Sequence, residues 1–340
     1  MPAQPGSDPL PAGLHPVALT GVGAQLPTRV LSNDFFAARL DTSDAWIRSR
    51  TGIATRRVLA PEENLWELCL PAAREALSMA GVEPASLELI VVATSSPDHP
   101  MPSTAAWLQA HLGATRAVAF DMEAACSGFV FGLAVVSQFI RTGLYTRCLL
   151  VGADALSRFM DYEDRNTSIL FGDGAGAVVV ERGQVEGLHA LKLATDGTRA
   201  DQLVIAPDAS PTDCVPRSRP QSFMRMNGRE IYKFVLDTVP DQIREVCHMA
   251  GCELDDIDAF LLHQANQRIL EGVATRLGVP LERVPSHLSR YGNTSAASIP
   301  IVLAEEVGAG RIKRGDTLCL SGFGAGLTWG SAIADWNGPA

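Results

Sequence analysis

Short, almost wholly apolar runs alternate with longer amphipathic or apolar segments along most of the chain. The apolar runs predict strands at 87–95, 117–122, 147–154, 176–181, 258–264 and 316–323. The longer segments predict helices at 71–81, 103–113, 126–142, 228–250 and 296–310. Strands this apolar are covered on both faces, so the pattern predicts an α/β protein in which helices pack on both sides of the sheets.

The order of the predicted elements repeats once along the chain. Corresponding strands lie about 170 residues apart, from 89 to 260 and from 148 to 319. A repeat of this length predicts two similar halves related by a pseudo-twofold axis. We therefore divide the chain into an N-terminal arm (1–14), a first half (15–185) and a second half (186–340). The arm is rich in Pro and Gly and is expected to be flexible.

Three segments do not fit the strand and helix pattern. The stretch 196–222 has no clear periodicity and predicts a long loop or a surface excursion. The sequence FGDGAGA (171–177) comes before a predicted strand, and its glycines predict a turn. The sequence TGVGAQLP (20–27) lacks the GxGxxG spacing and a downstream ribose-binding acid, so we reject a dinucleotide-binding loop.

Composition narrows the classes of function. The 340 residues are 46% hydrophobic and 19% charged, and the net charge of −10 argues against binding to nucleic acid or to an anionic membrane. No apolar run reaches membrane-spanning length, and the first residues lack the features of a signal peptide. The seven cysteines show neither metal-ligand spacing nor a disulfide framework. We expect a cytoplasmic protein that carries no metal.

The sequence MEAACSGFVFG (122–132) places Cys126 where a predicted strand gives way to an apolar helix. Unpaired backbone N–H groups and the helix dipole at such a position favour a thiolate. The small neighbours Ser127 and Gly128 leave room for a ligand to approach. A small cysteine in the core remains the alternative interpretation.

Two polar residues of the second half are candidates to act with Cys126. His263 ends the strand 258–264, and ligand clefts of α/β sheets form at strand ends, although a structural histidine is the alternative. Asn293 follows Gly292 in a turn that corresponds, in the repeat, to the loop carrying Cys126, and Thr294 and Ser295 are expected to cap the next helix. The Gly-rich loop 321–330 exposes backbone N–H groups that can stabilise an oxyanion.

Six segments, in this order and at this spacing, resemble the β-ketoacyl-acyl-carrier-protein synthase III family, the initiating condensing enzymes of type II fatty acid synthesis. They are DTSDAWIRSRTGIATR (41–56), AACSGF (124–129), FGDGAGA (171–177), HQANQRI (263–269), YGNTSAAS (291–298) and GFGAGLTWGSA (322–332). The resemblance covers about residues 15–336. It implies a thiolase-like fold of five αβαβα layers, a homodimer, and acyl-CoA and malonyl-acyl carrier protein as substrates, with no cofactor.

The resemblance also implies roles for individual residues. Cys126 is the expected nucleophile, His263 and Asn293 complete the triad, and the backbone N–H groups of Cys126 and Ala325 form the oxyanion hole. The residues expected to bind coenzyme A are Trp46, Arg50, Thr51, Arg165 and Asn266. Those expected to dock the carrier protein are Gln264, Ala265, Asn266, Gln267, Arg268 and Lys233. Met101 and Phe129 are expected to shape the acyl pocket, Met101 partly across the dimer interface.

These residues suit a decarboxylative Claisen condensation. A thiolate accepts the acyl group from acyl-CoA, and loss of CO₂ from the malonyl group supplies the carbanion. An acetyl starter is the first expectation, and a related enzyme of specialised metabolism with another starter is the alternative. A non-catalytic subunit is disfavoured because Cys, His and Asn are all present. A degradative thiolase would need a second catalytic cysteine, for which Cys319 is the remaining candidate.

Overall fold

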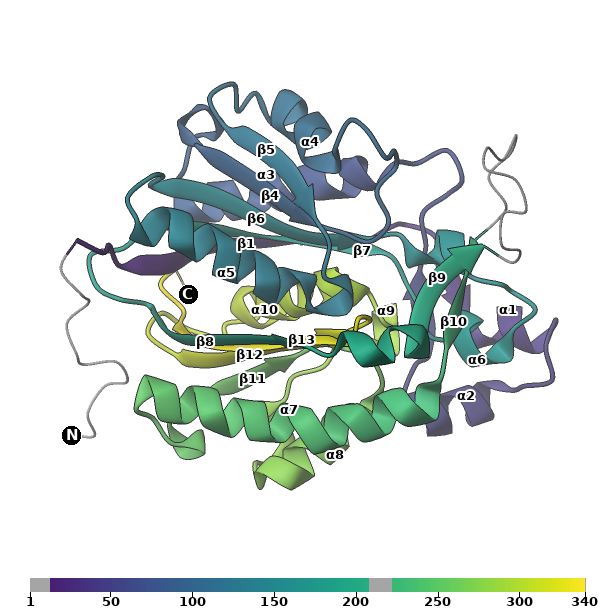
Figure 1. Cartoon of the computed structure of the whole chain (residues 1–340). Helices are drawn as coiled ribbons and strands as arrows, with labels where there is room; N and C mark the ends of the chain where they lie inside the picture. The colour runs from purple at the N-terminus through teal and green to yellow at the C-terminus, as the bar shows by residue number, and fades with distance from the viewer. Residues whose placement is uncertain (1–12, 208–221, 340) are drawn as a thin grey trace.

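A computed structural model describes residues 13–207 and 222–339 (Figure 1). Within these ranges the strands form one five-stranded sheet, one four-stranded sheet and two small two-stranded sheets. The five-stranded sheet consists, in spatial order, of β1 (Val17–Gln25), β7 (Gly174–Arg182), β6 (Arg147–Asp154), β4 (Leu89–Ala93) and β5 (Val118–Met122). The four-stranded sheet consists of β8 (Leu188–Thr195), β13 (Thr328–Asp335), β12 (Thr317–Gly324) and β11 (Ala259–Leu262).

The two large sheets have the same topology over four strands. In the first, β1, β7 and β6 pair antiparallel and β6 pairs parallel with β4; in the second, β8, β13 and β12 pair antiparallel and β12 pairs parallel with β11. The register repeats as well, since Leu89 pairs with Cys148 and Phe260 pairs with Cys319. The predicted duplication is therefore present in the fold, and β5 is the strand that the second sheet lacks among the described residues.

Helices complete five layers, as Figure 1 shows. The outer face of the first sheet is covered by α3 (Leu65–Ala80) and α4 (Thr104–Leu112). The space between the sheets is filled by α5 (Gly128–Arg141) and α10 (Ser298–Gly308). The outer face of the second sheet is covered by α7 (Gly228–Ala250) and α8 (Gln267–Leu277). The αβαβα arrangement of a thiolase-like fold is confirmed.

Alternation along the strands supplies both faces of each sheet with apolar side chains. In β4, Leu89 and Val91 join the central core with α5 and α10, whereas Ile90 and Val92 join the outer core with α3 and α4. All four side chains are fully buried. Burying such a side chain contributes about 1.5–3 kcal/mol to stability, so a strand of this kind stabilises the packing of the sheet against the helix layers on both of its faces.

Most of the shorter helices and strands lie at one end of the molecule (Figure 1). The short helices are α1 (Asn33–Ala37), α2 (Asp44–Thr51), α6 (Arg165–Ser168) and α9 (Leu288–Tyr291). The short strands are β2 (Val30–Ser32), β3 (Thr55–Arg57), β9 (Leu203–Pro207) and β10 (Ser222–Met226). The 3₁₀ turns are η1 (Pro84–Ser86), η2 (Ala125–Ser127), η3 (Leu156–Phe159), η4 (Gly197–Gln202), η5 (Leu254–Asp256), η6 (Leu281–Arg283) and η7 (Ser295–Ala297).

Predicted boundaries were wrong in three places. The Gly-rich loop expected at 321–330 is mostly strand, since β12 runs to Gly324 and β13 begins at Thr328. The helix expected from 71 begins at Leu65, because Asn64 and Glu67 form a capping box and Pro71 lies inside the helix. The glycines expected to form a turn at 171–177 belong mostly to β7, which begins at Gly174. A Cβ at Gly176 would lie 2.7 Å from the Pro300 side chain and 3.0 Å from the Ile301 backbone, so these glycines allow α10 to approach the sheet closely.

The structure also describes, wholly or in part, the other segments for which the sequence predicted no strand or helix. The irregular stretch 196–222 contains η4, β9 and the start of β10, and the rest of it lies outside the described residues. The rejected dinucleotide loop at 20–27 lies largely in β1, where a Cβ at Gly21 would lie 2.2 Å from the Ala76 carbonyl oxygen of α3. Most of the predicted N-terminal arm lies outside the described residues. Across the described ranges, no helix has both the length and the apolar character needed to cross a membrane.

Candidate active site

Cys126 lies in a tight turn between β5 and α5. Ala125, just before it, has φ +48°, a left-handed conformation that is uncommon for a residue other than glycine. The thiol is buried, with 5% of the residue exposed. Across from it, a Cβ on Gly324 at the end of β12 would lie 2.6 Å from the Cys126 backbone nitrogen. Only a glycine leaves that N–H group accessible from the β12 side.

His263 follows β11 and continues its pairing, because its backbone N–H donates to the Ser321 carbonyl at 2.8 Å. The ring is 1% exposed and packs edge-on against Phe323, with ring centroids 5.0 Å apart. Its Nδ1 lies 2.8 Å from the Ser298 hydroxyl. That hydroxyl also lies 2.8 Å from the Ser295 carbonyl, and it has one proton to donate. In the tautomer in which it donates to Nδ1, the imidazole carries its proton on Nε2, which is then a donor for a ligand.

The backbone of Asn293 is held in place by two hydrogen bonds to the segment 170–172. Its N–H donates to the Leu170 carbonyl at 2.9 Å, and its carbonyl accepts from the Gly172 N–H at 2.9 Å. The side-chain Oδ1 accepts from the Ser295 N–H at 2.9 Å. Among the described residues the amide Nδ2 has no hydrogen-bond partner, so its two protons are free to donate to a ligand.

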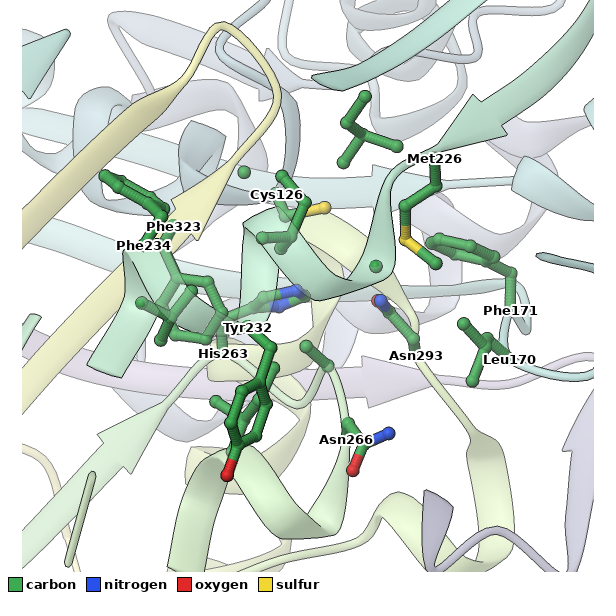
Figure 2. Close-up of a pocket in the computed structure, with 17 residues that line it drawn as sticks. Cys126, Leu170, Phe171, Met226, Tyr232, Phe234, His263, Asn266, Asn293 and Phe323 are labelled. Atoms are coloured by element: carbon green, nitrogen blue, oxygen red, sulfur yellow. The ribbon is translucent and has the colours of Figure 1, made fainter. Parts of the chain in front are cut away.

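The three side chains meet at one cavity, as Figure 2 shows. This cavity has a volume of about 120 Å³ and is also lined by Tyr232 and Asn266. Cys126, His263 and Asn293 come from segments far apart in sequence, and the repeat places two of them alike: η2 precedes α5 and η7 precedes α10. Ser295, the first residue of η7, has φ +53°, as Ala125 has φ +48° in η2. The turn at 293–295 is thus the counterpart of the cysteine turn.

The helix caps expected at Thr294 and Ser295 are absent. Neither the turn η7 nor α10 has a side-chain cap, and the Thr294 hydroxyl is buried without a hydrogen-bond partner within the described residues. The Ser295 hydroxyl instead lies 3.3 Å from Cys126 Sγ. Sequence patterns favour helix capping for these residue types, whereas the left-handed Ser295 turns its hydroxyl toward the cysteine.

Burial dominates the electrostatics of the site. It raises the pKa of Cys126 to about 12, and the Ser295 hydroxyl acts in the opposite direction. The expectation that the helix start favours a thiolate is therefore wrong for the resting site. Burial lowers the pKa of His263 to about 3, so the imidazole is neutral at physiological pH. A neutral imidazole beside a carboxamide forms a pair of uncharged hydrogen-bond donors.

A second cavity, of about 250 Å³, also borders Cys126, and Phe171 and Leu203 line both cavities. Its apolar walls come mainly from β9, β10 and their neighbours: Leu156, Phe171, Leu203, Val204, Ile205 and Met224. Ser95, Glu123, Ala125, Ser295 and Ala325 complete the lining. Ala325 thus lies beside Cys126, where a backbone donor was expected. None of these apolar wall residues was predicted, because most of them lie in the stretch 196–222, which was expected to be a loop, or on its neighbours.

The two residues expected to shape the acyl pocket lie elsewhere. Phe129 is fully buried in the central core on α5 and lines neither cavity. Its position on the first turn of an apolar helix directs it between the sheets. Met101 is 82% exposed and lines neither cavity of this chain.

Trp46, Arg50 and Arg165 form a cluster on α2 and α6. The Arg165 guanidinium lies 4.7 Å from the centroid of the Trp46 ring, and that of Arg50 lies 6.0 Å away. Asn266, at the start of α8, joins them because its Nδ2 donates to the Arg50 carbonyl at 3.3 Å. Thr51 does not: it is 3% exposed and its hydroxyl donates to the Ile47 carbonyl, closing the end of α2.

The segment expected to dock a carrier protein is only partly at the surface. Arg268 and Lys233 are exposed, on α8 and α7, and neither forms an ion pair within the described residues. The Arg268 guanidinium lies 5.8 Å from the ring centroid of Tyr232, which lines the first cavity. Ala265 and Gln267 are half-buried. Gln264 is fully buried, and its Nε2 donates to the Leu262 and Pro285 carbonyls, so it holds the His263 segment in place rather than facing a partner.

Comparison with known proteins finds similarity over most of the chain. Residues 120–197 match the family described as 3-oxoacyl-[acyl-carrier-protein (ACP)] synthase III, and residues 247–336 match its C-terminal region. A β-ketoacyl-[acyl-carrier-protein] synthase III of Gloeobacter violaceus is 51% identical over 94% of this chain and 98% of that protein.

Solved structures are similar over the same extent. The crystal structure of a 3-oxoacyl-(acyl carrier protein) synthase III from Pseudomonas aeruginosa superposes with a TM-score of 0.88 at 42% identity, covering 96% of this chain and 99% of that one. The priming β-ketosynthase of the R1128 polyketide biosynthetic pathway superposes with a TM-score of 0.91 at 32% identity, covering 98% of this chain and all of that one, 100%.

Proposed function

This chain belongs to the β-ketoacyl-acyl-carrier-protein synthase III family, acyl-transferring condensing enzymes that initiate fatty acid synthesis, and we propose that it joins acetyl-CoA to malonyl-acyl carrier protein through an acyl-enzyme on Cys126. The observation that carries this proposal is the meeting of a thiol, a neutral imidazole and a free carboxamide at one buried cavity. The cysteine also lines a second, apolar cavity.

In the first half-reaction the Cys126 sulfur attacks the thioester carbonyl of acyl-CoA and coenzyme A leaves. Exchange of one thioester for another costs little free energy, so the barrier comes mainly from the charge that develops on the carbonyl oxygen. The backbone N–H groups of Cys126 and Ala325 stabilise that charge, and one such donor is worth about 3 kcal/mol. The acyl chain enters the apolar cavity behind the cysteine.

In the second half-reaction the malonyl group loses CO₂, and the resulting enolate oxygen accepts hydrogen bonds from His263 Nε2 and Asn293 Nδ2. Because the imidazole is neutral, it donates a hydrogen bond to the enolate oxygen without placing a positive charge in the buried site. The enolate carbon attacks the acyl-enzyme carbonyl and expels the Cys126 sulfur, and 3-oxoacyl-acyl carrier protein is released. This chemistry requires no metal or prosthetic group.

Substrates reach Cys126 from the α2, α7 and α8 side. Trp46, Arg50 and Arg165 offer an aromatic ring and two cations for the nucleotide of coenzyme A, and Arg165 must move off Trp46 for an adenine to stack there. Asn266 lines the route to the cysteine and suits the amides of a pantetheine arm. Arg268 and Lys233 face the solvent where an acidic carrier protein would dock.

We also propose that the protein is a homodimer that functions in the cytoplasm. The edge of the five-stranded sheet is β5, where Val118 is 50% exposed, and the nearby Met101 is 82% exposed. An unpaired apolar edge strand is suited to pairing with a second copy. Dimerisation through β5 would cover Met101 and bring a partner toward the acyl cavity. Six cysteines in the described part of the chain are free and buried, which suits a reducing compartment.

The test is acylation with a panel of acyl-CoA thioesters followed by addition of malonyl-acyl carrier protein. An engineered cavity of about 150 Å³ holds benzene, so the 250 Å³ cavity admits chains longer than acetyl by size alone. Intact-protein mass is expected to rise by one acetyl group, and malonyl-acyl carrier protein is expected to remove it as a 3-oxoacyl product. Preference for a longer or branched starter, or no condensation with malonyl-acyl carrier protein, would refute the assignment to acetyl-CoA.

A further inference from the structure

Arg56 is a buried cation to which the mechanism above gives no role. It is the central residue of β3 and its side chain is fully buried. Burial lowers the pKa of Arg56 to about 10, so the guanidinium still carries its charge at physiological pH. Among the described residues it donates to an amide and to a backbone carbonyl, not to a carboxylate. Burying a cation without a carboxylate is unfavourable, so stability alone does not account for an arginine here.

The Arg56 guanidinium joins two segments that are far apart in sequence. Its Nη1 donates to Asn33 Oδ1 at 2.6 Å, and its Nη2 donates to the Ile169 carbonyl. Asn33 is itself held in place, because its Nδ2 donates to Asp44 Oδ1 and to the Ile53 carbonyl, each at 2.8 Å. The guanidinium therefore anchors the start of the segment 169–172 to a fixed partner.

The segment 169–172 in turn holds Asn293. The Asn293 N–H donates to the Leu170 carbonyl at 2.9 Å, and the Gly172 N–H donates to the Asn293 carbonyl at 2.9 Å. These two bonds form an isolated parallel bridge between Phe171 and Asn293. The segment belongs to the first half of the chain, so the first half fixes the position of a catalytic side chain of the second half.

The aliphatic part of Arg56 packs under the same bridge. A Cβ on Gly172 would lie 3.1 Å from the Arg56 Cβ, and a Cβ on Gly292 would lie 3.3 Å from it. The neighbouring Thr55 hydroxyl donates to the Arg290 carbonyl at 2.8 Å. Arg56 thus contacts both segments of the bridge, one with its guanidinium and both with its stem.

We propose that Arg56 is a positioning residue, which holds the segment 169–172 and through it places the Asn293 carboxamide for decarboxylation of the malonyl group. The bond from the Ser295 N–H to Asn293 Oδ1 orients the carboxamide within its own turn. The place of that turn relative to His263, which follows β11, depends on the bridge. A misplacement of about 1 Å can cost about 100-fold in rate. This inference rests on the proposed function and assigns a further residue to its second half-reaction.

Arg56→Lys tests the inference because it keeps a buried cation but offers one nitrogen, which cannot bond both Asn33 and Ile169 as the guanidinium does. In a Cys126→Ala background, decarboxylation of malonyl-acyl carrier protein is expected to slow at least about tenfold, through kcat and not KM. The loss is expected to stay below the about 100- to 1,000-fold that removal of one oxyanion donor causes. With Cys126 intact, acylation by acetyl-CoA is expected to stay near the parental rate.

The matched control is Arg57→Lys, a change of the same kind at the next residue of β3. Arg57 is half-buried, and its Nη1 donates to the Pro27 and Thr28 carbonyls at 3.2 and 3.3 Å, away from the bridge. The control is expected to leave both rates within about threefold of the parent protein. Arg56→Gln replaces Arg56→Lys if the lysine variant does not fold, and the same difference between the two rates is expected.

A double variant separates positioning from general support of the fold. In Cys126→Ala with Asn293→Ala, adding Arg56→Lys is expected to change the remaining decarboxylation rate less than about twofold, because the group that Arg56 positions is gone. Losses that multiply would overturn the inference, and so would parental decarboxylation in Arg56→Lys. Equal losses of acylation and decarboxylation would mean that Arg56 only supports the fold. A parent protein that neither takes an acetyl group nor decarboxylates malonyl-acyl carrier protein would refute the proposed function itself.

Discussion

The contact between Gly324 and Cys126 makes Gly324→Ala the sharpest single-residue perturbation of the site. An added Cβ would lie 2.6 Å from the Cys126 nitrogen and 3.0 Å from its Cβ, whereas ordinary contacts are 3.4 Å or more. The cysteine turn must therefore move by several tenths of an ångström, and the methyl group also covers the Cys126 N–H. Loss of one oxyanion donor costs about 2.7–4 kcal/mol, so we expect acylation to slow about 100- to 1,000-fold.

The assay is single-turnover acylation by acetyl-CoA, together with the rate of Cys126 alkylation by iodoacetamide. Alkylation forms no oxyanion, so it is expected to fall far less than acylation. The matched control is Gly322→Ala on the same face of β12, whose Cβ would lie 3.0 Å from the Ser127 Cα and does not approach the Cys126 N–H. Acylation of Gly324→Ala within a few-fold of the Gly322→Ala rate would refute the placement of the oxyanion hole.

Three further results follow from the geometry. Trp46→Ala should raise the KM for acetyl-CoA about tenfold with little change in kcat, because base stacking on an aromatic ring is worth about 1–3 kcal/mol. Initial rates at varied acetyl-CoA concentration measure this effect. An unchanged KM would exclude the stacking role. Arg268→Glu should raise the KM for malonyl-acyl carrier protein, most at low salt, and leave the KM for acetyl-CoA unchanged. Burial holds the pKa of His263 near 3, so the neutral imidazole persists above that pH. The rate of malonyl decarboxylation by Cys126→Ala should therefore stay constant from pH 8 to pH 5. A change in this rate with a midpoint near pH 6.5 would contradict a buried imidazole.

The sequence predicted the framework because the framework depends on periodic apolar patterns. The helix predicted at 228–250 is α7 to the residue, and the repeat predicted that the turns with Cys126 and Asn293 are counterparts. The meeting of Cys126, His263 and Asn293 followed from strand ends and the duplication. Each of these inferences rests on the spacing between segments along the chain, which is read directly from the sequence.

What the sequence did not predict depends on the direction in which side chains point. Thr51, Gln264 and Phe129 belong to segments that resemble binding motifs, yet each is buried. Thr51 and Gln264 donate to backbone carbonyls, and Phe129 packs in the central core. The walls of the second cavity come mainly from β9, β10 and their neighbours, and these two strands lie in a stretch that has no clear periodicity. The high pKa of Cys126 depends on burial from all sides, which opposes the local effect of a helix start.

The most direct test of the central claim is to locate the acyl group after reaction with isotopically labelled acetyl-CoA. Proteolysis and peptide mass measurement are expected to find one label, on Cys126, and malonyl-acyl carrier protein is expected to remove it only when His263 and Asn293 are both intact. A label on any other residue, or removal that persists in His263→Ala and Asn293→Ala, would contradict a single site shared by the three side chains.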